Sequence, residues 1–193
     1  DGQTGLADLL TSRGPALVAG HAGRTHGAAQ GASQGADQLK VTVDAKAIHG
    51  KGRTEGHFVW KSQDANGREI ATREIPVAVN VVDDFSTLSQ ADKDAGPALS
   101  LSATVIDFSA KKGATKQQLT ITNTGHAPLV FHSITCDASW VKVSGNKKKE
   151  LRPRESMTLT FALKDKAHKG ATDLYVVCND PQGPVRIVRI KAE

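Results

Sequence analysis

Histidine and cysteine are the residues of this chain best suited to bind a metal or attack a substrate. The sequence holds seven histidines and two cysteines, and a metal site needs three or four such ligands converging on one point. His21 and His26 lie in an Ala/Gly/Gln-rich arm, whereas His126 and His132 are six residues apart around a turn. No cysteine pair with zinc-finger spacing accompanies them. The sequence therefore predicts no metal site and no cofactor.

A Cys–His nucleophile pair is the next candidate, because His132 precedes Cys136 by four residues. On a β-strand these two side chains point to the same face but are roughly 13 Å apart. Proton transfer cannot span that gap, and a GxSxG nucleophile elbow is absent from the sequence. We predict that the protein has no catalytic residues and is not an enzyme.

Acidic and aromatic residues are the remaining candidates for a binding site. Asp83, Asp84 and Asp180 lack the spacing of a calcium loop, and Asp180 before a proline is typical of an Asx-type turn. Trp60 and Tyr175 occupy corresponding expected strands in two similar halves of the chain, which favours a core role for both rings. Trp140 follows a cysteine-containing turn and is the aromatic residue we expect to be exposed, where it could contact a sugar.

The charge is moderately basic, with a net charge of +5 and an isoelectric point near 9.3. Basic residues are scattered among acids except in the run from Asn146 to Arg154, which contains Lys147, Lys148 and Lys149. No aromatic residue lies in that run to stack on a base. This pattern argues against nucleic-acid binding, and it leaves the three lysines and Trp140 as candidate contacts with a ligand or partner.

Composition and hydropathy divide the chain into four segments. Residues 1–37 form a low-complexity segment in which Leu6–Leu10 and Pro15–Gly20 could pack on the first folded unit. Residues 38–83 are expected to form the rest of that unit, 84–98 a linker with at most one helical turn, and 99–193 a second domain. No apolar run is long enough for a membrane helix.

Alternating apolar residues predict strands on both sides of the linker. The first half has three candidates, at residues 39–45, 56–63 and 73–82. The second half has seven, at residues 99–109, 116–125, 127–136, 139–145, 156–164, 172–180 and 185–193. Short strands at this spacing indicate an all-β fold, and the similar layout of the two halves predicts tandem immunoglobulin-like β-sandwiches.

The turn between Leu119 and Cys136 has its own signals. Asn123 can fold its side chain onto the turn backbone, and we expect Gly125 to adopt a positive φ. Pro128, which has no N–H, suits the first residue of a strand. Apolar residues then occur on both faces of the following strand, as expected for a sandwich strand whose outer face is partly covered.

Five motifs occur in order in the second half of the chain: VIDFS, LTITNTGHAPLVFHSITC, LRPRESMTLTFALK, VVCNDP and VRIVRIKA. This ordered series resembles the bacterial family known as domain of unknown function 1573, which is related to Hydin-type immunoglobulin-like modules. The resemblance covers residues 99–193 and, as a half-copy, 38–83. This chain departs from the family pattern at Ser109 and Arg154, where glycine is usual, and at Asp137–Ala138, where a second cysteine often follows. The resemblance implies an immunoglobulin-like fold and an exported protein, and it implies no catalytic activity.

Cys136 and Cys178 could form one disulfide or remain two buried thiols. In an immunoglobulin-like order the strands that carry them are antiparallel neighbours, which puts the sulfurs at opposite ends of the sheet. Such a strand spans roughly 20 Å, whereas disulfide-bonded Cα atoms lie within about 7 Å. We therefore predict free thiols, with Cys178 as a small core residue.

The sequence as a whole predicts an exported protein of the bacterial envelope, whether secreted, periplasmic or on the cell surface. The chain starts at Asp1 and its single methionine is Met157, which suggests a cleaved leader. We expect a scaffold, spacer or protein-interaction role with an unidentified protein partner. The alternative is a carbohydrate-binding module that uses Trp140.

Overall fold

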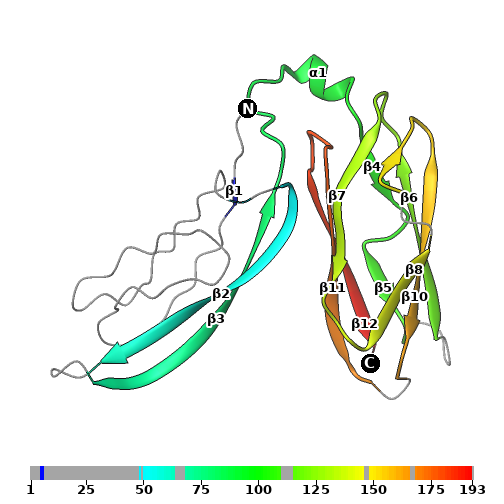
Figure 1. The fold of residues 1–193 in the computed structure, drawn as a ribbon. Helices are drawn as coiled ribbons and strands as arrows, with labels where there is room; N and C mark the ends of the chain where they lie inside the picture. Colours follow the sequence, from blue (N-terminus) through cyan, green and yellow to red (C-terminus); the bar gives the residue numbers. More distant parts are fainter. Residues whose placement is uncertain are drawn as a thin grey trace. The chain divides into compact units, whose positions relative to one another are not determined.

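The computed structural model describes residues 5–6, 48, 50–63, 68–109, 115–145, 148–165 and 168–192. The chain divides into two compact units, residues 1–81 and 82–193. Figure 1 shows the strands of both units, which with one short helix make up the described secondary structure. Within the described residues, no helix is long and apolar enough to cross a membrane.

The first unit contains a three-stranded sheet in the order β1-β3-β2. Strands β2 (Gly52–Gln63) and β3 (Glu69–Val81) form a long antiparallel hairpin, and β1 (Gly5–Leu6) pairs with the end of β3. Ile48, Val79 and Val81 form a small buried cluster. The hairpin confirms two expected strands, although both begin earlier than predicted. The strand expected at residues 39–45 and the packing segment Pro15–Gly20 lie outside the described residues, so a complete first sandwich stays a prediction.

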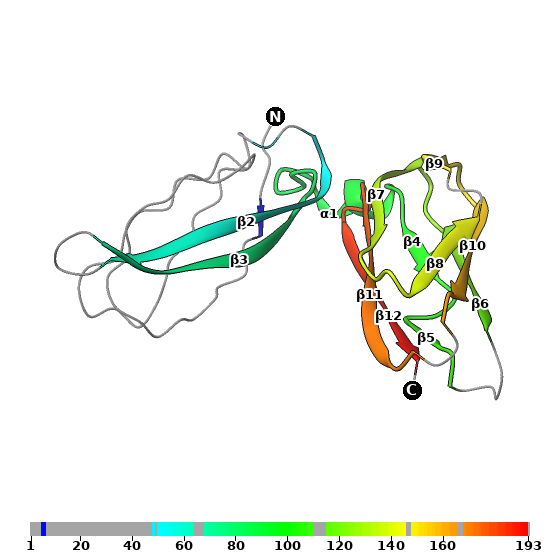
Figure 2. The same ribbon diagram turned by 60° about the horizontal axis from the view of Figure 1, so that its bottom comes forward.

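The second unit is a β-sandwich of two sheets (Figures 1 and 2). The four-stranded sheet has the order β4-β6-β10-β8, and the five-stranded sheet has the order β5-β12-β11-β7-β9. Their bounds are β4 Leu99–Leu101, β5 Val105–Asp107, β6 Lys116–Asn123, β7 Leu129–Cys136, β8 Val141–Gly145, β9 Glu150–Leu151, β10 Ser156–Leu163, β11 Gly170–Cys178 and β12 Val185–Ala192. The all-β sandwich expected from the alternation is confirmed.

Two details differ from the expected strands. The first predicted strand, at residues 99–109, is two strands: β4 pairs antiparallel with β6, and β5 pairs parallel with β12 in the other sheet. The chain changes sheets at residues 102–104, although its apolar alternation continues across them. Strand β9 was not predicted, because two residues that pair with Leu129 and Val130 are too short to show a period.

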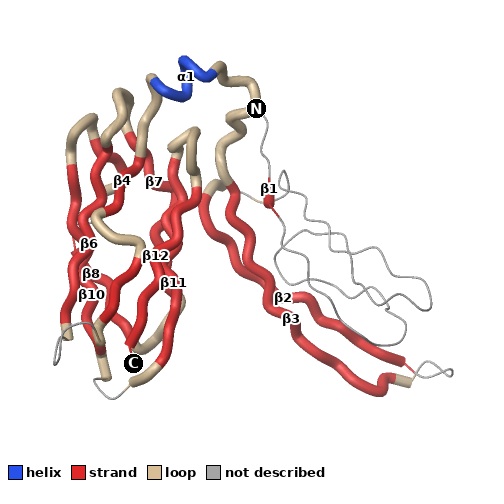
Figure 3. The backbone as a smooth tube through the Cα atoms, turned by 180° about the vertical axis from the view of Figure 1, so that it is seen from behind, coloured by secondary structure: helices blue, strands red, loops and turns tan. Residues whose placement is uncertain are grey.

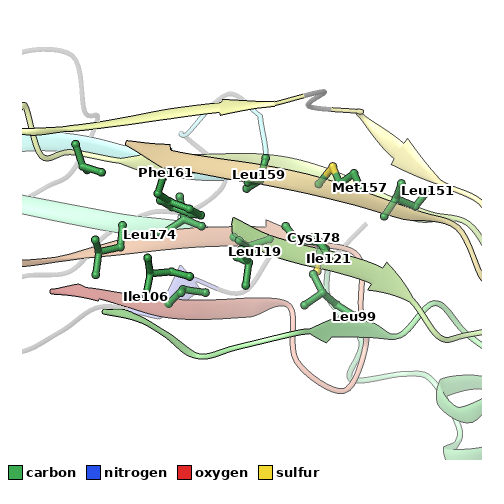
Figure 4. Packing of buried hydrophobic residues seen from close by; sticks show 14 of the residues in the cluster. Leu99, Ile106, Leu119, Ile121, Leu151, Met157, Leu159, Phe161, Leu174 and Cys178 are labelled. Atoms are coloured by element: carbon green, nitrogen blue, oxygen red, sulfur yellow. The ribbon is translucent and has the colours of Figure 1, made fainter. Parts of the chain in front are cut away.

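The core lies between the two sheets and is built from the alternate residues of each strand. Leu119, Leu159 and Phe161 from one sheet and Leu174 and Val176 from the other are fully buried. In Figure 4 the labelled side chains of this cluster fill the space between the ribbons of the two sheets. The strands expected to share a core therefore do so, with Phe131 at its half-buried margin.

The segment expected to be a linker carries local structure of its own. Helix α1 (Gln90–Asp94) starts with a capping box, in which the Ser89 side chain accepts from the Asp92 N–H and Asp92 accepts from the Ser89 N–H. The end of the segment is bonded to the sandwich, because Thr124 N–H donates to Ala98 C=O at 2.8 Å. Figure 3 shows the helix leading into β4.

Residues Arg152 to Glu155 form the turn before β10. The Glu155 N–H donates to the Arg152 carbonyl, and Arg154, the third residue, has φ 66°. A turn with proline second and positive φ third is of type II, which favours glycine at the third position. Arg154 is the one non-glycine residue with positive φ in the described part of the chain. The family pattern with glycine here therefore has a physical reason.

Replacing Arg154 with glycine is expected to stabilise the second unit by about 0.5–1 kcal/mol. Relief of the left-handed strain, about 1–2 kcal/mol, outweighs the flexibility that glycine adds to the unfolded chain. Chemical denaturation measures the gain, and Arg152→Gly in the same turn is the control, because it adds flexibility without relieving strain. Equal stability losses in the two variants would show that Arg154 is unstrained.

Candidate functional site

Asn123 is the last residue of β6, and its side chain holds the turn that follows. Its side chain is fully buried, and its Oδ1 accepts from the N–H groups of Gly125 at 3.0 Å and Ala98 at 3.4 Å. Its Nδ2 donates to the carbonyls of Ala127 at 2.8 Å and Leu151 at 3.0 Å. The expected bond onto the turn backbone is confirmed, and the same amide also joins two other loops. Asn123 is a structural residue that leaves no free group for a ligand.

Gly125 is required for a different reason from the one expected. Its φ is not among the positive values of the described glycines, so the expected left-handed conformation is wrong. A Cβ at this position would instead lie 2.4 Å from the Gly96 carbonyl oxygen and 2.4 Å from the Ala98 nitrogen. The His126 N–H also donates to that Gly96 carbonyl. Glycine is needed because two backbone segments meet here.

Asp180 is the buried carboxylate of the turn between β11 and β12. Its Oδ1 accepts from the Gln182 N–H at 2.9 Å, which confirms the expected Asx-type turn. Its Oδ2 accepts from the Leu99 N–H at 3.0 Å and from the Arg186 guanidinium at 3.3 Å. Sequence reasoning missed the Leu99 bond, which links positions 81 residues apart. Both oxygens of the Asp180 carboxylate are therefore hydrogen bonded within the fold.

The histidines that the structure describes do not converge on one site. His132 Nε2 lies 2.7 Å from Asp83 Oδ2, and His126 is exposed in the turn after β6. His168 is stacked on Trp140, and His21 and His26 lie outside the described residues. Across the described part of the chain, no group of three or more His, Cys, Asp or Glu side chains could hold a metal ion.

The two cysteines are free, as predicted. On the antiparallel pair of β7 and β11, Cys136 is opposite Leu174 and Cys178 is opposite Phe131, at the other end of the pairing. Burial raises the pKa of Cys178 from its ordinary value of 9.0 to about 11. Burial also raises the pKa of Cys136. Both thiols stay protonated at neutral pH, which disfavours a nucleophilic role.

The raised pKa of Cys178 makes the stability of the second unit depend on alkaline pH. Between about pH 9 and 11 the thiol of the unfolded chain loses its proton while the folded thiol keeps it. The free energy of unfolding therefore has its full value below pH 9 and decreases above it. At pH 10 we expect a loss of about 1.4 kcal/mol from this group. Denaturation of Cys136→Ala at pH 8 and 10 measures it, with Cys136→Ala/Cys178→Ala as the control. An equal pH dependence in both proteins would contradict the assignment.

Trp140, the candidate sugar platform, was expected to be exposed but is half-buried. One face of its ring stacks on His168, with centroids 4.5 Å apart and planes at 20°, and the side chain also packs against the core. Tyr175, expected in the core, is half-buried and alternates with the core residues Leu174 and Val176, so it lies on the other face of β11. The side chain of Trp60 lies outside the described residues.

The two candidate lysines that the structure describes, Lys148 and Lys149, occur away from Trp140. Lys148 forms an ion pair with Glu155, Lys149 is exposed, and Lys147 lies outside the described residues. The Lys149 carbonyl accepts from the Phe131 N–H, near the start of β7, whereas Trp140 follows the end of β7. Lys148 and Lys149 therefore lie at the opposite end of the sandwich from Trp140, and these three residues do not form one contact surface.

The outer face of the five-stranded sheet exposes apolar side chains that sequence reasoning missed. Ile187 on β12 is 52% exposed and Val105 on β5 is 43% exposed. Val105 is paired with Arg189, whose guanidinium donates to both oxygens of Asp173, at 3.0 and 3.1 Å. Ile187, Val105, Arg189 and Asp173 form what we call the apolar patch. The sequence feature that could have revealed this patch is the VRIVRI run, because every second residue of a strand points outward.

Comparison with known proteins identifies the second unit. The family model described as HYDIN/CFA65/VesB-like, Ig-like domain, matches residues 97–193. No match was found among curated proteins. The family match confirms the immunoglobulin-like character expected from the sequence, whereas domain of unknown function 1573 and the tandem repeat stay predictions.

Two solved structures were compared with the chain, and one of them shares its fold. A protein of unknown function from Porphyromonas gingivalis W83 has 22% identity and a TM-score of 0.66, over 99% of this chain and 90% of that one. The secreted serine protease VesC from Vibrio cholerae has 11% identity and a TM-score of 0.31, over 70% of this chain and 34% of that one. The first likeness shows the fold, and the second is too low to support any inference.

Proposed function

Because the chain belongs to the HYDIN/CFA65/VesB-like family of Ig-like domains through residues 97–193, we propose that it is a non-enzymatic interaction module. Its role is that of a scaffold or spacer that binds another protein in the bacterial cell envelope. The family match indicates the fold of residues 97–193. The proposed partner surface is inferred from the exposed residues of this chain.

The apolar patch is the observation that carries the proposal. Exposed aliphatic side chains beside an arginine are typical of protein interfaces, in which arginine is enriched. Ile187 and Val105 are two of the three large hydrophobic residues that are exposed in the described part of the chain. The Arg189–Asp173 pair beside them supplies polar contacts at the rim.

The non-enzymatic role is supported by how the polar residues are used. Asn123 and Asp180 are buried and have their hydrogen bonds within the turns they hold together. Both cysteines have raised pKa values, which disfavours the thiolate needed for attack. These buried polar side chains and thiols therefore stabilise the fold and are not available for catalysis.

The envelope location rests on the resemblance of the ordered motifs to an exported bacterial family. Carbohydrate binding through Trp140 has less support than protein binding, because His168 occupies one face of the ring and the core contacts the side chain. A sugar that stacks on an aromatic residue needs an open ring face. We therefore place the partner surface at the apolar patch.

Site-specific photocrosslinking tests the proposal. A photoreactive residue at position 187 in intact cells is expected to give one discrete protein adduct in the envelope fraction. Excess unlabelled protein should compete for that adduct, whereas excess Ile187→Asp should not. Arg152, exposed in the turn before β10 and outside the apolar patch, is the control position. No adduct at 187, an equal adduct at 152 or an adduct in the cytoplasmic fraction alone would contradict the proposed role.

A further inference from the structure

The outer face of the four-stranded sheet has a composition unlike that of the apolar patch. Its two central strands, β6 and β10, turn Leu119, Ile121, Leu159 and Phe161 inward. By alternation they turn six uncharged polar side chains outward: Gln118, Thr120, Thr122, Ser156, Thr158 and Thr160. We call these six residues the hydroxyl face.

The hydroxyl face is a regular array. Thr122 is paired with Ser156, Thr120 with Thr158, and Gln118 with Thr160 across the β6–β10 ladder. The Thr122 and Ser156 hydroxyls are 2.8 Å apart and hydrogen bonded. Gln118, Ser156 and Thr158 are exposed, and the three other residues are half-buried. The array therefore presents donors and acceptors in fixed rows on a sheet surface.

A row of lysines ends the hydroxyl face. Lys116 on β6 and Lys142 on β8 are both paired with Ala162 on β10, which lies between them. Both lysines are exposed. Strands lie about 4.8 Å apart, so the two Cα atoms are roughly 10 Å apart across the small alanine. The outward residues of these four strands include no Asp or Glu, so the face has positive charge at one end and none elsewhere.

We propose that the hydroxyl face and its lysine row bind an acidic polysaccharide, with carboxylate or sulfate groups on the lysines and sugar hydroxyls on the threonine and glutamine rows. Hydroxyl and amide groups both donate and accept, which suits sugar hydroxyls. The lysines are the charge complement of an anionic group. This site is separate from the apolar patch, and it holds whether or not the patch binds a protein.

The composition of the hydroxyl face disfavours three other ligands: a protein partner, a second copy of the chain and a neutral sugar. Protein interfaces are enriched in aromatic residues, methionine and arginine, and depleted in lysine and serine. The face has none of the first group and several of the second. A second copy of the chain would bring its own lysine row against the same uncharged face and leave that charge unmatched. A neutral sugar would find no aromatic ring on which to stack, and it would make no use of Lys116 and Lys142.

Binding to polygalacturonate, measured with the full chain by affinity electrophoresis and calorimetry, tests the proposal. We expect retardation by polygalacturonate and none by neutral dextran. Lys116→Gln/Lys142→Gln should weaken binding roughly tenfold, because each exposed charge contact is worth at most about a fivefold change in affinity. Lys149→Gln/Arg152→Gln, which removes equal charge from the other end of the sandwich, should leave affinity unchanged. Added 0.5 M salt, which shortens the screening length to about 4 Å, should abolish retardation.

Two further measurements separate a sugar from other acidic partners. Thr158→Val/Thr160→Val keeps the shape and charge of the face but removes two hydroxyls, and it should weaken polygalacturonate binding about threefold or more. Poly-glutamate should bind less tightly and be insensitive to these threonine changes. The proposal is overturned by absent retardation, by full binding in the lysine variant, by equal loss in the Lys149/Arg152 control, or by poly-glutamate binding that matches polygalacturonate.

Discussion

Replacing Phe161 with alanine is expected to lower the free energy of unfolding of the second unit by about 3–5 kcal/mol. Phe161 is 0% exposed and is the largest of the fully buried side chains described. It belongs to β10, which pairs with β6 on one side and β8 on the other. Because neighbours are fixed on both sides, they cannot move in to fill the space, and the cavity remains. The loss should therefore be in the upper part of the range for phenylalanine.

Native-state hydrogen exchange of amides in β6 and β11 measures this loss in the intact chain, without assuming that the two units unfold together. Thr158→Ala is the matched control, because it truncates an exposed side chain on the same strand. We expect a change within about 0.5 kcal/mol for the control. A Phe161→Ala effect as small as the control's would mean that the two sheets do not share this core.

Replacing Asn123 with alanine is expected to cost about 3–5 kcal/mol in the same unit. The change leaves two N–H groups, of Ala98 and Gly125, and two carbonyls, of Ala127 and Leu151, without the amide that satisfies them. Each buried group that loses its partner costs about 1–3 kcal/mol, reduced where water can enter. The effect rivals that of Phe161→Ala, although the side chain is small and polar.

Asn123→Asp separates the hydrogen bonds from the volume of the side chain. Aspartate keeps the acceptor for Gly125 and Ala98, but an ionised carboxylate cannot donate to Ala127 and Leu151. We expect a large loss at pH 7 that is partly recovered at acidic pH, where the protonated carboxyl donates once. Hydrogen exchange of the β6 and β10 amides reports both. Wild-type stability for Asn123→Asp at pH 7 would show that the two donated bonds are unimportant.

The strands of the second unit were predictable because alternation and turn residues agree along most of it. Leu119, Leu159, Leu174 and their neighbours alternate as expected and form one core. The division of residues 99–109 into β4 and β5 was not predictable, because its apolar spacing continues while the chain passes from one sheet to the other. Local pattern predicts that a strand exists, and it does not predict which sheet receives it.

The candidate site was less predictable because pairing, rather than spacing, assembles it. Lys116 and Lys142 are 26 positions apart in the sequence. They lie in one row only because each is paired with Ala162 on β10. The consecutive Lys147, Lys148 and Lys149 were predicted as candidate contacts because they are adjacent in the sequence. In the structure Lys148 forms an ion pair with Glu155. The chemistry of Asn123 and Asp180 was partly visible as turn chemistry, whereas their bonds to distant loops depend on the complete fold.

The parallel pairing of β5 with β12 has a mechanical consequence. A pull on the chain before β5 and after β12 draws two parallel strands in opposite directions along their length. Their bonds, which include Arg189 N–H to Thr104 C=O and Phe108 N–H to Lys191 C=O, are then loaded together in shear, rather than broken one after another. Resistance to such force is set by the rate of unfolding under load, not by equilibrium stability. The unit is thus arranged to bear tension along the chain.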